Sequence, residues 1–244
     1  MESFSTWDSL LNYIDNHQSY NSDITFYRGQ TNANWKLTPS YLRYHKTKRY
    51  EKVYYYDFVS HSGSLVPAHY NSWDILFLMQ HHGIPTRLLD WTESFGVALY
   101  FALKGNPESP AIWVIDPFTL NHEAIGKEEI LNPHIEICAE YCDTYLEENR
   151  IDHRLPVAVY PEKMNSRILA QKGVFTLQGQ VDDPIEAVCE KFIKKISIPE
   201  KLIPDAIRFL KFAGIDEYSL FPDLDGLSRF LKERHKDKDA RYQW

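Results

Sequence analysis

Two arginines stand in segments whose neighbours are mostly apolar. Arg28 follows Ile24-Thr25-Phe26-Tyr27, and Arg87 opens the run Arg-Leu-Leu-Asp-Trp. A buried guanidinium without a partner is unstable, so each arginine needs a carboxylate, several carbonyl oxygens or an anionic ligand. The planar guanidinium binds two oxygens of a phosphate at once. Gly29, directly after Arg28, lets a ligand or another backbone approach closely. Together the two arginines favour a shared anion-binding cleft.

Buried ion pairs are the alternative for both arginines. Arg87 could pair with Asp90 or with a glutamate elsewhere in the chain. Such a pair would hold the loop and would leave no donor for a ligand. The sequence leaves both interpretations of Arg87 open, and it favours the structural one for Asp90.

The segment around Arg87 is expected to be extended. Gly83 and Pro85 end a helix over 72–82, and residues 86–92 then form a strand. Alternation gives this strand two faces, one with Thr86, Leu88, Asp90 and Thr92 and the other with Arg87, Leu89 and Trp91. Arg87 and Trp91 are therefore within reach of a common ligand.

The paired histidines His81 and His82 titrate near neutral pH, so they could act as acid or base. Histidine is also common at a helix C-terminus, where it meets the helix dipole, and that role suits one of the pair better. With Asp90 they would form a metal-dependent nuclease or phosphodiesterase site, which the sequence favours less.

A third cluster precedes a predicted strand over 173–177. Arg167 and Gln171 lie one turn apart on a short helix and face the same way. A ligand site and a solvated helix face both fit this spacing, and the second is the better interpretation of the cluster taken alone.

The three cysteines fit neither a disulfide framework nor a metal site. Cys138 and Cys142 could share a helix face with His134, but a fourth zinc ligand is missing, and Cys189 stands apart. We expect buried thiols in a reducing compartment and no metal. The sequence also contains no Gly-x-Gly-x-x-Gly, Walker, His-Glu-x-x-His or Gly-x-Ser-x-Gly motif.

The composition is that of a globular protein with no general attraction to polyanions. The chain has 244 residues, 43% of them hydrophobic, and a net charge of -7. Nothing therefore draws the whole protein to nucleic acid or to an anionic membrane. No long apolar run or signal-like start occurs, so we expect a soluble, cytoplasmic protein.

The hydrophobic pattern predicts an α+β fold, with a mixed, mostly antiparallel sheet flanked by helices, in a single domain over 1–244. The expected strands are 24–30, 86–92, 111–115, 157–160, 173–177 and 195–198. The expected helices are 7–14, 51–66, 72–82, 94–103, the short one at 165–172 and two C-terminal helices that begin near Pro204 and Pro222. Residues 35–43 should form an irregular loop, 125–149 a helical insertion and 232–244 a charged tail.

Several of these motifs together resemble the FRG domain family of bacteria and phages. They are Phe26-Tyr27-Arg28-Gly29-Gln30, the segment Trp35 to Ser40 with Arg43, Gln80 to Thr92, and Arg167 to Thr176. The resemblance covers most of the chain, and Pro-Thr-Arg-Leu-Leu-Asp-Trp-Thr is its most specific part.

The resemblance implies an arrangement like that of ADP-ribosyltransferases, by analogy at the level of fold. Arg28 would bind the ribose or pyrophosphate of NAD, and Trp91 would lie near the nicotinamide. Such enzymes usually carry a glutamate on a late strand, whereas the matching motif here offers Gln171 or Gln178. An amide supplies no negative charge, and Glu93 is the substitute to consider.

The implied function is an NAD- or nucleotide-utilising enzyme that transfers ADP-ribose to a protein or nucleic acid, as a toxin or phage-defence effector. The alternative is a non-catalytic nucleotide-binding sensor or interaction module with the same cleft. The candidate catalytic residues are Arg28, Arg87, Gln171 and Glu93. The candidate ligand-binding residues are Arg28, Gln30, His82, Thr86, Arg87, Asp90, Trp91, Thr92 and Arg167.

Overall fold

The computed structural model describes residues 4–16, 24–44, 49–105, 107–133, 140–147, 151–162 and 165–236. The proposed partners His134 and Cys138 lie outside the described residues, as do parts of the expected insertion over 125–149 and of the expected tail over 232–244.

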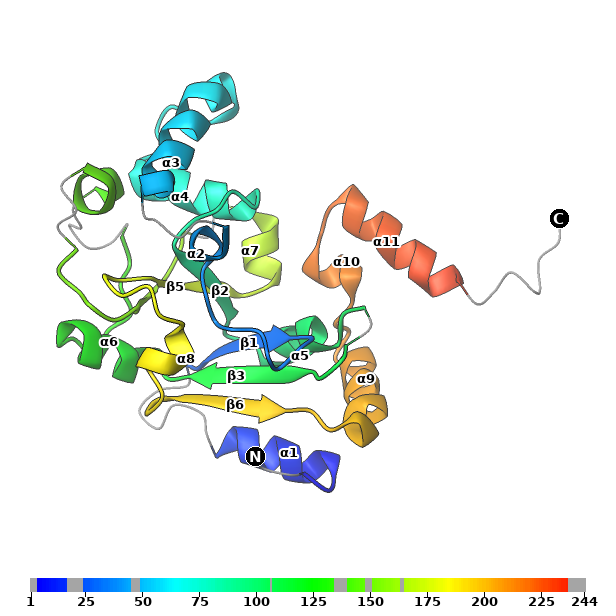
Figure 1. Ribbon diagram of the computed structural model, residues 1–244. Helices are drawn as coiled ribbons and strands as arrows, with labels where there is room; N and C mark the ends of the chain where they lie inside the picture. The colour runs from blue at the N-terminus through cyan, green and yellow to red at the C-terminus, as the bar shows by residue number, and fades with distance from the viewer. Residues whose placement is uncertain are drawn as a thin grey trace, which may run out of the picture.

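A six-stranded antiparallel sheet forms the centre of the molecule (Figure 1). Its order is β4-β5-β2-β1-β3-β6. The strands are β1 (Phe26–Gln30), β2 (Leu88–Thr92), β3 (Ala111–Ile115), β4 (Val157–Val159), β5 (Gly173–Leu177) and β6 (Ile193–Ser197). The α+β prediction and all six predicted strands are confirmed, with ends that shift by a few residues.

The sheet divides between its two central strands. Along the fully described β1 and β2, the register consists of the single pair Tyr27–Thr92, whereas β2 pairs with β5 over its whole length from Leu88–Leu177 to Thr92–Gly173. β1 likewise pairs with β3 from Phe26–Ile115 to Gln30–Ala111. The carboxyl half of β1 and the amino half of β2 therefore diverge and leave a gap in the hydrogen-bonded sheet.

One face of the β1, β3 and β6 half is covered by α1 (Trp7–Asp15), α5 (Phe95–Leu103) and α9 (Ile203–Phe212). Leu10, Leu99 and Leu210 from these helices share a core with Tyr27 and Val114. The apolar faces of the three helices drive this packing because burial removes their side chains from water.

Gly29 fixes how closely α5 approaches the sheet. A Cβ atom at this position would lie 2.6 Å from the backbone nitrogen of Ala102, and closer still to the carbonyl oxygen of Ala98. Only a glycine permits such a distance between a strand and a helix backbone. Close approach of another backbone, one of the two roles predicted for Gly29, is therefore observed.

The β2, β4 and β5 half is covered by α3 (Arg49–Ser62), α4 (Ser72–His81) and the π-helical segment Cys142–Glu147, which together bury Tyr55, Phe77 and Tyr145 against Phe175. Figure 1 shows α3 and α4 side by side above this half. On another core surface, α6 (Pro117–Ile125) and α8 (Ile185–Val188) contribute Leu120 and Ile185.

Several local predictions need correction. The loop expected over 35–43 ends in a short helix, α2 (Ser40–Tyr44). Within the described part of the expected insertion, residues 126–133 are not helical, and helix resumes only near Cys142. Residues 232–235 of the expected charged tail are still helical and belong to α11 (Leu224–His235). The described chain also contains the short helices α7 (Ser166–Ala170), as predicted, and α10 (Glu217–Leu220), and two 3-10 turns at Gly63–Leu65 and Glu200–Leu202.

A buried histidine makes stability depend on pH. His153 is 2% exposed, and its Nδ1 donates to the Leu155 carbonyl oxygen while Nε2 accepts from the Tyr145 hydroxyl. Burial lowers the pKa of His153 below its ordinary value of 6.5. A protonated ring could not keep the Tyr145 bond as an acceptor, because Nε2 would then carry hydrogen.

The unfolded chain therefore takes up a proton near pH 6.5 that the folded chain rejects, so stability falls as pH falls through this value. We expect the free energy of unfolding to decrease by up to about 1.4 kcal/mol per pH unit below that point. Urea unfolding at pH 7.5 and pH 5.5 measures this slope. The slope should flatten in His153→Gln and persist in the exposed control His122→Gln; equal slopes in all three proteins would contradict the assignment.

Candidate functional site

A cavity of about 990 Å³ opens where β1 and β2 diverge. Its wall is built from β1, the loop leading to α2, the C-terminal end of α4, β2, α5 and α7. Segments far apart in the sequence meet here because the sheet order places β1 beside β2. The volume lies in the range of pockets that hold small organic ligands.

The wall of this cavity carries a strong excess of positive charge. Four cationic side chains line it, Arg28, Lys36, Arg43 and Arg167. Among the described lining residues, the only Asp or Glu is Asp90. Because the whole chain has a net charge of -7, this local excess runs against the overall composition. The cavity is therefore suited to an anionic ligand.

Arg28 is held in the cavity wall by a hydrogen bond across the gap between the strands. Its Nη1 donates to the backbone carbonyl oxygen of Asp90 across the gap between the strands, and its Nε is buried with no hydrogen-bond partner. Burial lowers the pKa of Arg28, with Asp90 acting against this effect and Arg43 adding to it. Arginine nevertheless stays protonated in proteins.

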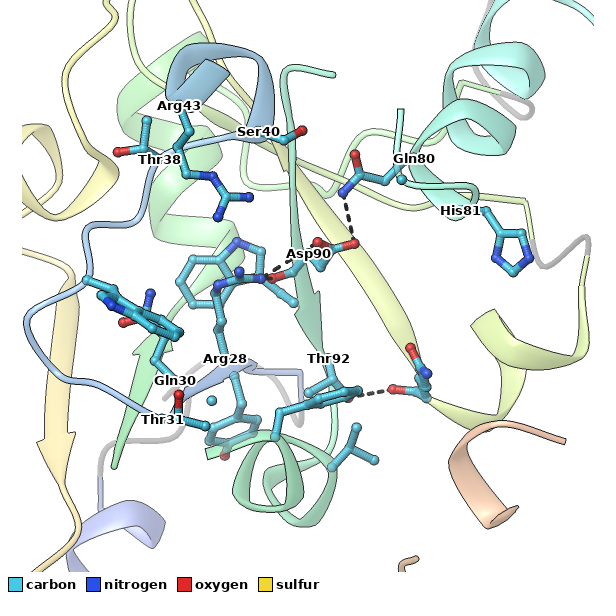
Figure 2. Close-up of a pocket in the computed structure, with 18 of the residues that line it drawn as sticks. Arg28, Gln30, Thr31, Thr38, Ser40, Arg43, Gln80, His81, Asp90 and Thr92 are labelled. Atoms are coloured by element: carbon cyan, nitrogen blue, oxygen red, sulfur yellow. Dashed lines mark hydrogen bonds and ion pairs between the residues drawn. The ribbon is translucent and has the colours of Figure 1, made fainter. Parts of the chain in front are cut away.

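Figure 2 shows the Arg43 side chain reaching from α2 toward Arg28. Two guanidinium groups that face one cavity repel each other, and an anion between them would relieve that repulsion. With its unpaired Nε, Arg28 thus lacks the interactions that an oxyanion ligand would supply.

Asp90 is held by a short chain of hydrogen bonds (Figure 2). Gln80 Nε2 donates to Asp90 Oδ1 at 3.0 Å, and the Thr86 hydroxyl donates to Gln80 Oε1 at 2.5 Å. The Thr86 hydroxyl in turn accepts from the backbone nitrogen of Leu88 at 3.1 Å. This chain fixes the Gln80 amide with its nitrogen toward Asp90, although the Asp90 side chain itself is 60% exposed.

Aromatic side chains complete the wall. Those that line the cavity are Tyr27, Trp35, Tyr44, Trp91 and Phe101. Trp35 is 57% exposed and so presents a ring face that a planar base could stack on. Trp91 is 3% exposed and donates from Nε1 to the Thr176 hydroxyl at 3.0 Å, so most of its ring belongs to the core.

Sequence comparison agrees with the motifs. The family model of the FRG domain matches residues 23–110. Residues 23–110 are an FRG domain. A search of curated proteins and a search of solved structures found no match.

The FRG domain supplies most of the cavity wall, including Arg28, Arg43, Gln80 and Asp90. Arg167 and Gln171 lie outside the matched residues and close the cavity from α7 and the turn that follows it. The third motif of the sequence is thus brought to the FRG domain by the pairing of β5 with β2.

Most of the predicted site residues meet at this cavity. Those that line it are Arg28, Gln30, His82, Asp90, Trp91, Thr92, Arg167 and Gln171. Gln30 accepts from Trp113 Nε1 at 2.8 Å, and the Thr92 hydroxyl donates to the Gln171 carbonyl oxygen at 2.7 Å. These two side chains therefore also join neighbouring strands and segments.

Arg87 requires a correction, because it does not line the cavity of the FRG domain. Its side chain is 1% exposed and forms a two-pronged ion pair with Glu51 of α3, in which Nε lies 2.8 Å from Oε1. Nη1 donates to the Gln178 carbonyl oxygen at 3.3 Å, and the guanidinium carbon lies 4.8 Å from the centre of the Tyr145 ring. The structural ion pair is the interpretation that holds, with Glu51 as the partner.

Thr86 and Glu93 also lie off the cavity wall. Thr86 is fully buried and acts on the site through Gln80. Glu93 accepts a hydrogen bond at 2.7 Å from the hydroxyl of Tyr160, directly after β4, and it is not among the lining residues. Gln171 does line the cavity, but its Nε2 donates to the Leu220 carbonyl oxygen at 3.1 Å. The predicted substitutes for a catalytic glutamate are therefore engaged elsewhere or lie outside the cavity.

The lining residues without an assigned role in the sequence include four polar or aromatic side chains, Trp35, Lys36, Arg43 and Gln80. All four belong to the quoted FRG motifs, and this membership was the sequence signal that could have identified them. Their convergence depends on the path of the loop to α2 and on the turn after α4, neither of which follows from periodicity. His81 joins them on the wall, and burial lowers its pKa, with Arg167 and His82 adding to the effect.

Two further findings concern metal ligands and membrane-spanning helices. In the part of the chain that the structure describes, no group of three or more His, Cys, Asp or Glu side chains is arranged to hold a metal ion. No described helix has both the length and the apolar character that crossing a bilayer requires.

Proposed function

We propose that this FRG domain binds a nucleotide in the cavity and that the protein is an NAD- or nucleotide-utilising enzyme of ADP-ribosyltransferase type. The observation that carries the proposal is the lining itself, which sets four cations against one carboxylate and adds exposed aromatic surface. A nucleotide combines an anionic phosphate group with a flat, stackable base, so it matches both properties.

Arg28 is the expected phosphate or ribose anchor. Its guanidinium is constrained from one side by the Asp90 carbonyl oxygen, and it keeps an unpaired, buried Nε. Arg43 reaches the same space (Figure 2) and could complete a clamp around a pyrophosphate. The order of motifs, an arginine on β1, an aromatic residue on β2 and a third motif before β5, agrees with the arrangement that the family resemblance implies.

A non-catalytic nucleotide sensor is the second candidate, and one observation favours it. Gln171 and Gln178 are neutral, and Glu93 accepts from Tyr160 and does not line the cavity, so none of the three predicted substitutes supplies a negative charge to it. A sensor would show saturable nucleotide binding and release no product. A metal-dependent nuclease using His81, His82 and Asp90 finds no supporting cluster among the described residues.

The biological setting follows from the same resemblance. An enzyme that transfers ADP-ribose to a protein or nucleic acid would suit a toxin or phage-defence effector. Lys36 extends the positive wall, which suits a nucleic-acid acceptor, and the proposal also includes a protein acceptor.

The test is mass spectrometry of nucleotide products after incubation with NAD. We expect product from the wild type and roughly 100-fold less from Arg28→Ala, because losing a charged contact to a ligand costs a few kcal/mol. The matched control is Arg208→Ala, which removes an arginine that is 66% exposed on α9. Equal product from folded Arg28→Ala and wild type would remove Arg28 from the mechanism.

A further inference from the structure

We infer that Asp90 is the catalytic carboxylate of the site, and this inference rests on the proposed function. Transfer of ADP-ribose needs a negative charge close to the ribose, because positive charge develops on the sugar as the glycosidic bond breaks. Among the described residues that line the cavity, Asp90 is the only one able to supply that charge.

The surroundings of Asp90 are those of a positioned carboxylate. The Thr86 hydroxyl donates to Gln80 Oε1, which orients the amide so that Nε2 donates to Asp90 Oδ1. Thr86 is fully buried, so the chain of bonds is anchored in the core. A side chain held by an oriented neighbour loses less freedom when it meets a substrate.

The charge of Asp90 is only partly compensated. Its Oδ2 lies 3.8 Å from Arg28 Nη1, which is beyond normal hydrogen-bond distance. Arg28 Nη1 donates instead to the backbone oxygen of Asp90. The side chain is 60% exposed and borders the cavity (Figure 2). The carboxylate is therefore accessible to a ligand that Arg28 binds.

The reaction can be written with its atoms and charges balanced. The bond between ribose C1′ and the nicotinamide nitrogen breaks, and its electron pair leaves with neutral nicotinamide. The carboxylate of Asp90 stabilises the positive charge that develops on the ribosyl group. Water or an acceptor nucleophile then bonds to C1′, and its proton passes to Asp90 and on to solvent. The products are nicotinamide, the ADP-ribosyl adduct and a proton.

Gln80 and Thr86 act as positioning residues in this account. Both act on Asp90 through hydrogen bonds, and Thr86 does not line the cavity. We expect Thr86→Val to lower kcat with little change in KM. Thr86→Ser should restore the rate, because serine keeps the hydroxyl that orients Gln80, whereas a purely packing role would be better served by valine.

The deciding experiment is Asp90→Asn in the full chain, with NAD affinity measured by calorimetry and nicotinamide release measured by chromatography. Asparagine keeps an oxygen that accepts from Gln80, and it replaces the second, charged oxygen with a neutral amide nitrogen. We expect nicotinamide release to fall roughly 100-fold or more while Kd changes less than about threefold. Asp205→Asn, on α9 and away from the cavity, is the control for both measurements.

The outcomes distinguish a failure of the Asp90 role from a failure of the proposed function. Nicotinamide release by Asp90→Asn or by a second variant, Asp90→Ser, at a rate near the wild-type rate overturns the role of Asp90. A wild-type protein that binds NAD and releases no nicotinamide also overturns it and leaves the nucleotide site standing. A wild-type protein that does not bind NAD overturns the proposed function itself.

Discussion

Replacing Arg87 with methionine should lower the free energy of unfolding by about 3–5 kcal/mol, because it leaves a buried carboxylate without its partner. Glu51 is 3% exposed, and its oxygens accept from Arg87 and from the Tyr141 hydroxyl. The ion pair ties α3 to the start of β2, and Arg87 also bonds the Gln178 carbonyl oxygen beyond β5. Losing it should loosen three elements at once.

Urea unfolding of paired variants measures this effect. Arg208→Ala, which removes a surface arginine paired with Asp205, should cost less than about 1 kcal/mol. The double variant Arg87→Met with Glu51→Leu should be more stable than Arg87→Met alone, since no charge is then left buried. A loss below about 1 kcal/mol for Arg87→Met would show that the ion pair contributes little.

Replacing Gly29 with alanine should cost about 3 kcal/mol or more, at or above the upper end of ordinary overpacking. The added methyl group would lie 2.6 Å from Ala102 N and 2.9 Å from Ala98 C. Both atoms belong to the backbone of α5, so no side-chain rotation relieves the overlap. The helix would have to move off β1, and the cavity wall that α5 forms would move with it.

Gly173→Ala is the matched control, because this glycine also lies on a strand paired on both sides. A Cβ atom at Gly173 meets nothing closer than 3.7 Å. The free energy of unfolding of Gly173→Ala should therefore stay within about 1 kcal/mol of the wild-type value. Thermal unfolding of both variants tests the comparison. Similar melting temperatures for Gly29→Ala and Gly173→Ala would mean that α5 does not pack as described.

The sequence predicted the fold class, and it singled out Arg28, which lines the cavity, because both predictions depend on local signals. Alternation and β-branched residues mark β1, and an arginine followed by a glycine on such a strand is unusual enough to be noticed. The sheet order was not predictable in this way, since it depends on which strands meet across long stretches of chain. The gap between β1 and β2, which makes the cavity, comes from their pairing at Tyr27–Thr92 alone, and alternation along either strand does not reveal that register.

Arg87 shows the limit of the same argument. Its sequence neighbourhood looked like that of Arg28, yet one arginine faces a cavity and the other a buried glutamate. The difference comes from Glu51, which lies on α3 and is separated from Arg87 by 36 positions. No spacing rule connects a helix residue to a strand residue at that separation.

The surroundings of Asp90 could not be predicted for a related reason. Its interaction with Gln80 exists because the turn at Gly83 and Pro85 folds the end of α4 back onto β2. The sequence predicted that turn, but not which side chains it would bring together. Only with the cavity lining known does Asp90 stand out as its lone carboxylate among the described residues.

The most direct measurement of the central claim is calorimetric titration of the wild-type protein and Arg28→Ala with NAD. We predict saturable binding to one site per chain in the wild type, weakened roughly 100-fold in Arg28→Ala and unchanged in Arg208→Ala. No binding of NAD or any common nucleotide by the folded wild-type protein would contradict the assignment of the cavity.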